Sequence, residues 1–106
     1  MGLLFWKNNK KIDLFAQSIA DDLFSHIRPD IARQYYLGKG KIPKKQLRRV
    51  EQKVNDTLLQ AQRYGADNSL GIYGSARLQK QFNDRLGELG YEIEVIREIS
   101  RAMLLQ

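Results

Sequence analysis

The sequence predicts an all-α protein, a single-domain bundle of four to five helices around a long central helix that spans residues 43–64. Two observations predict this class. Apolar residues recur every three or four positions through each long segment, which is the period of a helix that buries one face. Both prolines and most of the glycines fall between these segments, where they begin or end helices. The 106 residues are enough for one core.

The central helix has one apolar side and one basic side. Pro43 suits its first turn, where a missing N–H costs nothing, and Gly65 is expected to end it in the left-handed conformation. Leu59 points to the polar side, so it must be covered by another element or left exposed. The apolar side carries Leu47, Val50, Val54, Leu58 and Ala61.

The N-terminal part predicts two further helices. The first runs from about Lys11 to Ile27, and the second from Pro29 to Leu37, with Gly38 closing it. Residues 1–10 are assigned to an apolar and basic N-terminal tip, which we allow to be flexible, and residues 11–106 to the helical domain. The inward face of the first helix is expected to hold Ile12, Phe15, Ala16, Ile19, Ala20, Leu23 and Ile27.

A fourth helix is predicted after a loop that spans Ala66 to Gly74. Ser75 is its expected N-cap, and Gly90 its left-handed stop. Tyr91 is then placed to pack back on Leu86, as in a Schellman ending. The inward stripe is expected to hold Leu78, Phe82, Leu86 and Leu89.

The last predicted helix spans about Glu92 to Leu105, with Ile93, Ile96, Ile99 and Met103 facing inward. Residues 91–96 also alternate between apolar and acidic, which is the period of a strand. We prefer helix for this segment, because the apolar spacing continues through Met103 and a two-stranded ribbon alone is marginally stable.

The excess of positive charge is local. The formal net charge is +6, from 18 basic and 12 acidic residues. Seven basic residues and one acid, Glu51, lie between Lys39 and Lys53, so the rest of the chain is neutral. Such a patch binds or steers anions. The candidate residues for contact with nucleic acid or another anion are Lys39, Lys41, Lys44, Lys45, Arg48, Arg49 and Lys53.

Several features favour or weaken this interpretation. Tyr35 and Tyr36 lie just upstream and could stack on bases. Residues 71–74 match the GXXG loop of KH domains, but that fold needs a three-stranded sheet, so we interpret them as a turn. A helix-turn-helix formed by the last two helices is disfavoured, because Glu92 and Glu94 at the start of the supposed reading helix would repel phosphates.

Enzyme chemistry finds little support in the sequence. The chain has no cysteine and one histidine, His26, which we expect to be partly buried and structural. No phosphate-binding loop or paired carboxylates stand out. We therefore predict a non-enzymatic protein without a cofactor or a metal. No segment is long and apolar enough to span a bilayer, and we expect a cytoplasmic location.

Three hypotheses for function remain. The first is a small helical binding protein whose basic face contacts nucleic acid or another polyanion. The second is a protein–protein interaction module, such as an adaptor, inhibitor or immunity-type protein that docks on an acidic partner, or a homo-oligomer. The third is peripheral membrane association through Met1 to Lys11, where Leu3, Leu4, Phe5 and Trp6 precede lysines.

Overall fold

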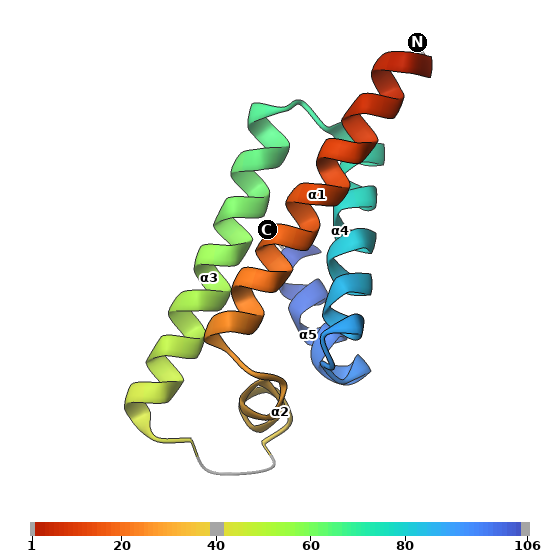
Figure 1. Cartoon of the computed structure of the whole chain (residues 1–106). Coiled ribbons are helices and arrows are strands. Elements are labelled where there is room, and N and C mark those ends of the chain that lie inside the picture. Colours follow the sequence, from red (N-terminus) through yellow and green to blue (C-terminus); the bar gives the residue numbers. More distant parts are fainter. Residues whose placement is uncertain (1, 39–41, 105–106) are drawn as a thin grey trace.

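The computed structural model describes residues 2–38 and 42–104, and the side chains of residues 9–38 and 42–103. This described part is a bundle of five α-helices and contains no strand (Figure 1). The predicted fold class is therefore confirmed. The alternative of a strand at residues 91–96 is wrong, because a helix begins at Ile93.

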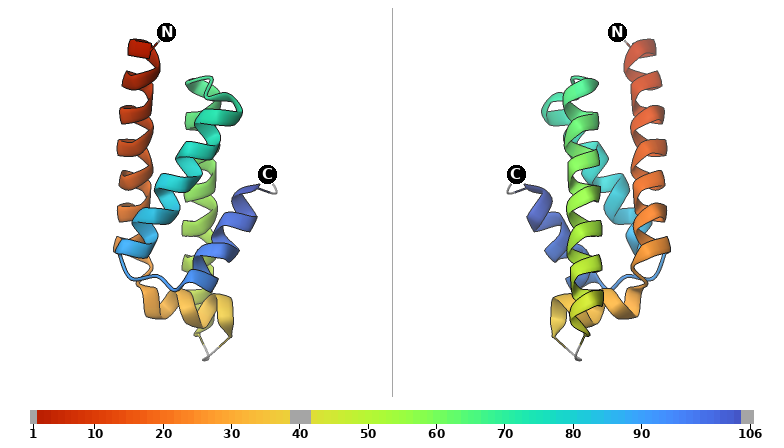
Figure 2. Two further views of the ribbon diagram at one scale, coloured as in Figure 1. Left: turned by 90° about the vertical axis from the view of Figure 1, so that its right-hand side faces the viewer. Right: turned by 90° about the vertical axis from the view of Figure 1, so that its left-hand side faces the viewer.

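Three long helices and a shorter one form the body of the bundle, and one helix crosses its end. The long helices are α1 (Gly2–His26), α3 (Lys44–Asp67) and α4 (Gly71–Glu88). The short helix α2 (Pro29–Leu37) lies across the lower end in Figure 1, and α5 (Ile93–Leu104) runs back from that end beside α3 and α4 (Figure 2).

The helices α1 and α4 run in the same direction and stay in register. Asp13 contacts Arg77, Asp21 contacts Arg85, and the carbonyl of Ile27 accepts a hydrogen bond from the hydroxyl of Tyr91. Each of these pairs is separated by 64 residues. A constant offset is what two parallel helices produce, and the helix α3 between them in sequence runs in the opposite direction (Figure 1).

One contiguous core joins all five helices. Phe82 and Leu86 of α4 and Val95 of α5 have no exposed surface. The inward face predicted for the first helix is confirmed, with Phe15 half-buried and stacked on Tyr64 of α3 at 3.9 Å between ring centroids. The apolar side predicted for the central helix is also buried from Val50 to Ala61.

The first helix begins earlier than the sequence indicated. The backbone is helical from Gly2, so the predicted start near Lys11 is wrong. No proline or glycine interrupts residues 3–11, and nothing in that stretch stops a helix from extending. The apolar side chains at residues 3–6 lie outside the described side chains.

The connection between α3 and α4 is also shorter than predicted. Gly65 does not end α3, which continues to Asp67. The left-handed residues instead are Ser69, with φ 49°, and Gly71, with φ 68°. The predicted loop at residues 66–74 and the N-cap at Ser75 are therefore wrong, because α4 begins at Gly71.

The predicted end of α4 is confirmed. Gly90 has φ 102°, its N–H donates to the carbonyl of Gly87 at 3.1 Å, and the N–H of Tyr91 donates to the carbonyl of Leu86 at 3.1 Å. These two bonds define the Schellman motif. At α2, Gly38 is likewise left-handed with φ 64°, as expected.

The inward face of α5 differs from the prediction at its first residue. Ile93 is 59% exposed, whereas Val95 and Ile99 are buried. The Schellman ending places Tyr91 in the core, and burial then follows at intervals of four residues through Val95 and Ile99. This phase turns Ile93 outward.

Candidate anion-binding surface

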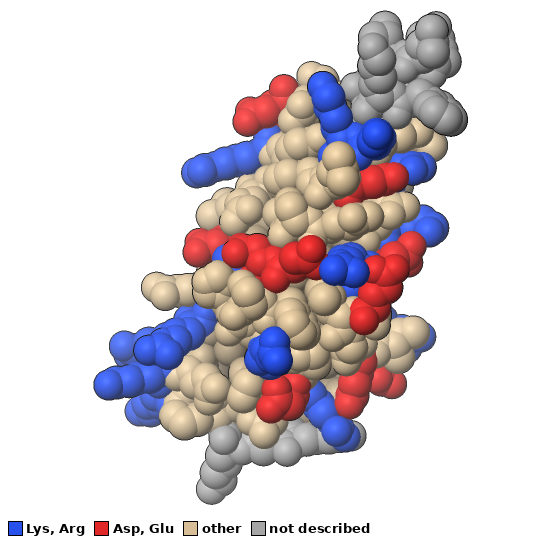
Figure 3. All heavy atoms as spheres, in the orientation of Figure 1, with Lys and Arg blue, Asp and Glu red and all other residues tan. Residues whose placement is uncertain are grey.

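Four cationic side chains project from the first two turns of α3. We call Lys44, Lys45, Arg48 and Arg49 the basic face. All four are exposed. Figure 3 shows a cluster of basic atoms at the lower left, over the N-terminal end of α3 as oriented in Figure 1. The basic face accounts for four of the seven basic residues that the sequence placed between residues 39 and 53.

The basic face has no carboxylate partners within the described residues. Neither a hydrogen bond nor an ion pair joins any of its four side chains to another described side chain. Elsewhere in the same bundle arginines do find partners: Arg33 contacts Glu92 at 3.0 Å, and Arg77 contacts Asp13 at 2.8 Å. The basic face is therefore available to an external anion.

The position of the basic face weakens the helix that carries it. Lys44 and Arg48, and likewise Lys45 and Arg49, are like charges four residues apart, and each such pair destabilises a helix by about 0.2–0.5 kcal/mol. The first turn of α3 contains no acidic residue, and its N-cap, Pro43, provides no side-chain hydrogen bond. Cations at this positive end of the helix dipole are unfavourable by a similar amount. A bound anion would offset both effects.

Lys53 does not belong to the basic face, although the sequence grouped them together. Its ammonium donates to the carboxylate of Asp22 on α1, and its side chain is only 15% exposed. The two residues are 31 positions apart, so no sequence pattern could have revealed the pair. Lys39 and Lys41, the other two predicted contact residues, lie outside the described residues.

The two tyrosines predicted to stack on bases are partly buried against the core. Tyr35 and Tyr36 of α2 are half-buried and contact each other edge to face, with 4.8 Å between their ring centroids. Burial raises the pKa of the Tyr36 hydroxyl well above its usual range, with smaller contributions from Tyr35 and Glu98. Burial and the charge of Glu51 also raise the pKa of Tyr35. Both rings therefore contribute to packing at the end of the bundle.

His26 and the glycines at residues 71 and 74 were the other candidates from the sequence. His26 is exposed, so its predicted partial burial is wrong; it ends α1, and its Nδ1 lies 2.9 Å from the carbonyl oxygen of Asp22. Residues 71–74 form the first turn of α4 rather than a GXXG loop. Gly74 is buried there, and a Cβ at this position would lie 2.7 Å from the Cβ of Leu70, so a larger residue would require Leu70 to shift. Among the described residues, no group of three His, Asp or Glu side chains could hold a metal ion.

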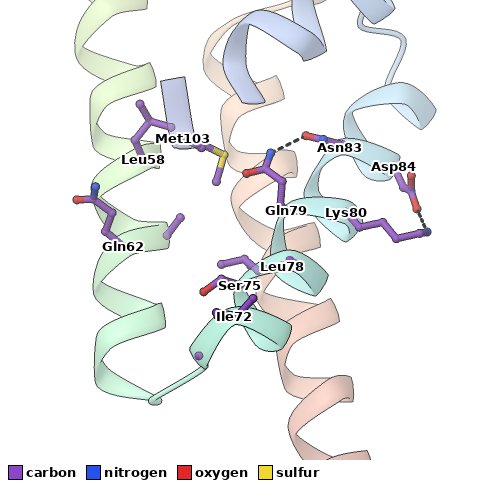
Figure 4. Close-up of a pocket in the computed structure, with 13 residues that line it drawn as sticks. Leu58, Gln62, Ile72, Ser75, Leu78, Gln79, Lys80, Asn83, Asp84 and Met103 are labelled. Carbon is purple, nitrogen blue, oxygen red and sulfur yellow. Dashed lines mark hydrogen bonds and ion pairs between the residues drawn. The ribbon is translucent and has the colours of Figure 1, made fainter. Parts of the chain in front are cut away.

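A second surface feature, which the sequence reasoning missed, is an open groove between α3 and α4. The 12 residues of α5 cover only part of the face that the longer helices α3 and α4 form. Beyond Met103 a groove of about 970 Å³ remains, with Leu58 and Leu78 among its lining residues (Figure 4). Ile72, at 93% exposure, also lines it. The short last helix was the available signal for this gap.

A polar cluster joins α4 to α5 beside the groove. The amide of Gln79 donates to Asn83 at 3.1 Å and to the hydroxyl of Ser100 at 3.0 Å, and Ser100 donates to Asn83 at 2.9 Å. Lys80 and Asp84 form an exposed ion pair at 2.8 Å nearby (Figure 4). The bonds of Ser100 with Gln79 and Asn83 hold α4 and α5 together.

Comparisons with protein-family models, with curated proteins and with solved structures found no match to this chain. Among the described residues, no helix has the length and apolar character that crossing a lipid bilayer requires.

Proposed function

We propose that this protein is a small, non-enzymatic binding protein whose basic face on α3 contacts nucleic acid or a similar polyanion. The observation that carries the proposal is that Lys44, Lys45, Arg48 and Arg49 are all exposed and have no carboxylate partner among the described residues. Clustered cations of this kind contact phosphates and release the counterions that those phosphates hold.

The arrangement of charge elsewhere supports this choice of surface. Among the described residues, seven Asp or Glu side chains pair with Arg or Lys across or along helices: Asp13, Asp21, Asp22, Asp84, Glu88, Glu92 and Glu98. None of them forms an ion pair with a side chain of the basic face. On α3 itself only the exposed carboxylates Glu51 and Asp56 lie near that face among the described residues, too few to neutralise its four cations. The face therefore keeps a net positive potential and can attract an anionic partner from about one Debye length, roughly 10 Å at 0.1 M salt.

The test compares two double variants with the same total charge. Arg48→Gln/Arg49→Gln removes two cations from the basic face, and Arg63→Gln/Arg97→Gln removes two exposed arginines elsewhere on α3 and α5. Binding to a fluorescein-labelled nucleic-acid duplex is measured by anisotropy at 50 mM salt. We expect the first variant to bind at least tenfold more weakly and the second to stay within about twofold of the wild type. Equal losses would assign binding to net charge alone, and absence of wild-type binding would exclude the proposal.

The groove between α3 and α4 favours a second candidate function, docking of another protein. An exposed apolar residue beside an apolar groove is typical of protein interfaces. Under this alternative, Ile72→Glu abolishes complex formation or self-association in light scattering, whereas Arg49→Glu does not. Under the primary proposal, the protein is monomeric at micromolar concentration with either substitution.

A further inference from the structure

We infer that the polyanion is B-form double-helical DNA and that the N-terminal half of α3 enters its major groove, with Gln52 and Asn55 contacting base edges. This inference rests on the proposed function. It adds the class of nucleic acid, the groove and the residues that would give sequence preference.

The helix α3 has the shape that such a contact requires. In the right-hand view of Figure 2 it lies in front of the other helices along its whole length. The outward strip that begins with the basic face continues through Gln52 and Asn55, which are also exposed. From Lys44 to Asn55 this strip is about 16 Å long, and a helix about 10–12 Å wide fits a major groove about 12 Å wide.

The strip carries amide side chains along its middle and cations on one side. At 100° per residue, Arg48, Gln52 and Asn55 lie within about 60° of one another along its middle. The amides of glutamine and asparagine pair with adenine in the major groove. Gln52 and Asn55 make no hydrogen bond with another described residue, so their amides are available for this contact. Lys45 and Arg49 lie on one flank, where phosphates border the groove.

Other nucleic acids fit this surface less well. Single strands are bound by stacking their bases on exposed aromatic rings, but Tyr35 and Tyr36 are partly buried and contact each other edge to face. The exposed aromatic residue among the described side chains, Tyr73, lies beyond the opposite end of α3. Double-stranded RNA has a deep, narrow major groove that does not admit a helix.

The carboxylate of Asp56 limits how far along α3 the proposed contact with DNA can extend. Asp56 follows Asn55 on the exposed side of α3 and would repel phosphates. Glu51, which is also exposed, lies about 20° beyond Lys44 at the edge of the strip, so its carboxylate must face away from the phosphates. The carboxylate of Asp22 is neutralised by Lys53. The strip that can approach DNA therefore ends at Asn55.

The first experiment compares three probes of one sequence: a 20-base-pair DNA duplex, the corresponding RNA duplex and one DNA strand. Anisotropy titrations at 50 mM salt are expected to give at least tenfold tighter binding to the DNA duplex than to either alternative. Equal or tighter binding to RNA or to the single strand would overturn this inference and leave the proposed function standing. Absence of binding to all three would overturn both.

The second experiment tests the two amides. Selection from a randomised DNA duplex pool is expected to enrich a motif with the wild type, and Gln52→Ala/Asn55→Ala is expected to lose that enrichment. Its affinity for unselected duplex should stay within twofold, because neither amide is charged. Gln60→Ala, an exposed amide beyond Asp56 on the same helix, is the matched control and should retain the motif. Absence of a motif with the wild type, or an unchanged motif with the double variant, would overturn the role of the amides.

Discussion

The contact between α1 and α4 and the outer surface of α3 use basic residues in different ways. On α4, the guanidinium of Arg77 donates two hydrogen bonds of 2.8 Å to Asp13, and that of Arg85 donates one of 2.7 Å to Asp21. On α3, Lys44, Lys45, Arg48 and Arg49 have no such partner among the described residues. Both sets lie on helices of one small bundle.

The difference separates cations that hold the fold from cations that are free to bind. The α1–α4 pairs join residues 64 positions apart and fix the register of two parallel helices. The basic face forms no ion pair with another described residue, and its like charges four residues apart weaken α3 slightly. Changes at the α1–α4 contact should therefore alter stability, and changes at the basic face should alter binding.

The largest expected effect comes from reversing the basic face. The variant Lys44→Glu/Lys45→Glu/Arg48→Glu/Arg49→Glu should bind a DNA duplex at least a hundredfold more weakly than the wild type, because four phosphate contacts become repulsive. Its melting temperature should be unchanged or higher, since acids are favourable at the start of a helix. Retained binding would show that another surface is responsible, and a lost helical circular-dichroism signal would show that the basic face supports the fold.

Tyr91 follows α4 and bonds to Ile27, which follows α1, so it tests the pairing of these two segments through an uncharged side chain. Its buried hydroxyl donates to the carbonyl of Ile27, and Tyr91→Phe should lower the free energy of unfolding by about 1–2 kcal/mol, because a buried acceptor loses its partner. Urea denaturation at pH 7 measures this change.

The same hydroxyl predicts a pH dependence. Burial raises the pKa of Tyr91 well above its usual range, an effect that nearby Arg28 partly offsets. In the unfolded chain a tyrosine ionises near pH 10. The stabilisation is therefore complete below about pH 10 and is lost as the pH rises above it, because the unfolded state releases its proton first. Between pH 9.5 and 11 the wild type should lose more stability than Tyr91→Phe; parallel curves would contradict the assignment.

Arg77 tests a charged member of the same contact. Arg77→Met should lower the free energy of unfolding by about 1 kcal/mol, because a well-aligned bidentate pair with Asp13 is removed. The loss should shrink at high salt. Affinity for DNA should change less than twofold even though the net charge falls by one. A binding loss equal to that of an arginine from the basic face would remove the distinction between the two sets of cations.

The smallest expected effect distinguishes two neighbouring cations of α3. Arg49→Gln should weaken DNA binding about fivefold near 0.1 M salt, because one phosphate contact is lost. Lys53→Gln should change it less than twofold, because that ammonium is already held by Asp22. Equal effects in anisotropy titrations would mean that Lys53 exchanges Asp22 for phosphate on binding.

The sequence predicted those parts of the fold that local chemistry determines. The buried face of α1, the whole of α2 and the ending of α4 at Gly90 follow from apolar spacing and from residues that favour left-handed backbone. Local rules failed where tertiary packing decides. Gly65 remains inside α3, and the packing of Tyr91 sets the phase of α5 and turns Ile93 outward.

The sequence predicted only some residues of the candidate site correctly. The spacing of Lys44, Lys45, Arg48 and Arg49 on a helix placed them on an outward face, and the structure has them exposed. The grouping of Lys53 with them failed, because its partner on α1 is distant in sequence. Stacking by Tyr35 and Tyr36 could not be judged without knowing that α2 packs across the end of the bundle.

The salt dependence of DNA binding tests the central claim most directly. The logarithm of the affinity for a DNA duplex is measured against the logarithm of salt concentration from 50 to 200 mM, for the wild type and for Lys44→Gln/Lys45→Gln/Arg48→Gln/Arg49→Gln. Four phosphate contacts predict a slope of about −3.6 for the wild type, and the variant should show a slope near zero with little residual binding. A wild-type affinity independent of salt, or a slope that the four substitutions leave unchanged, would contradict the claim that the basic face binds a polyanion.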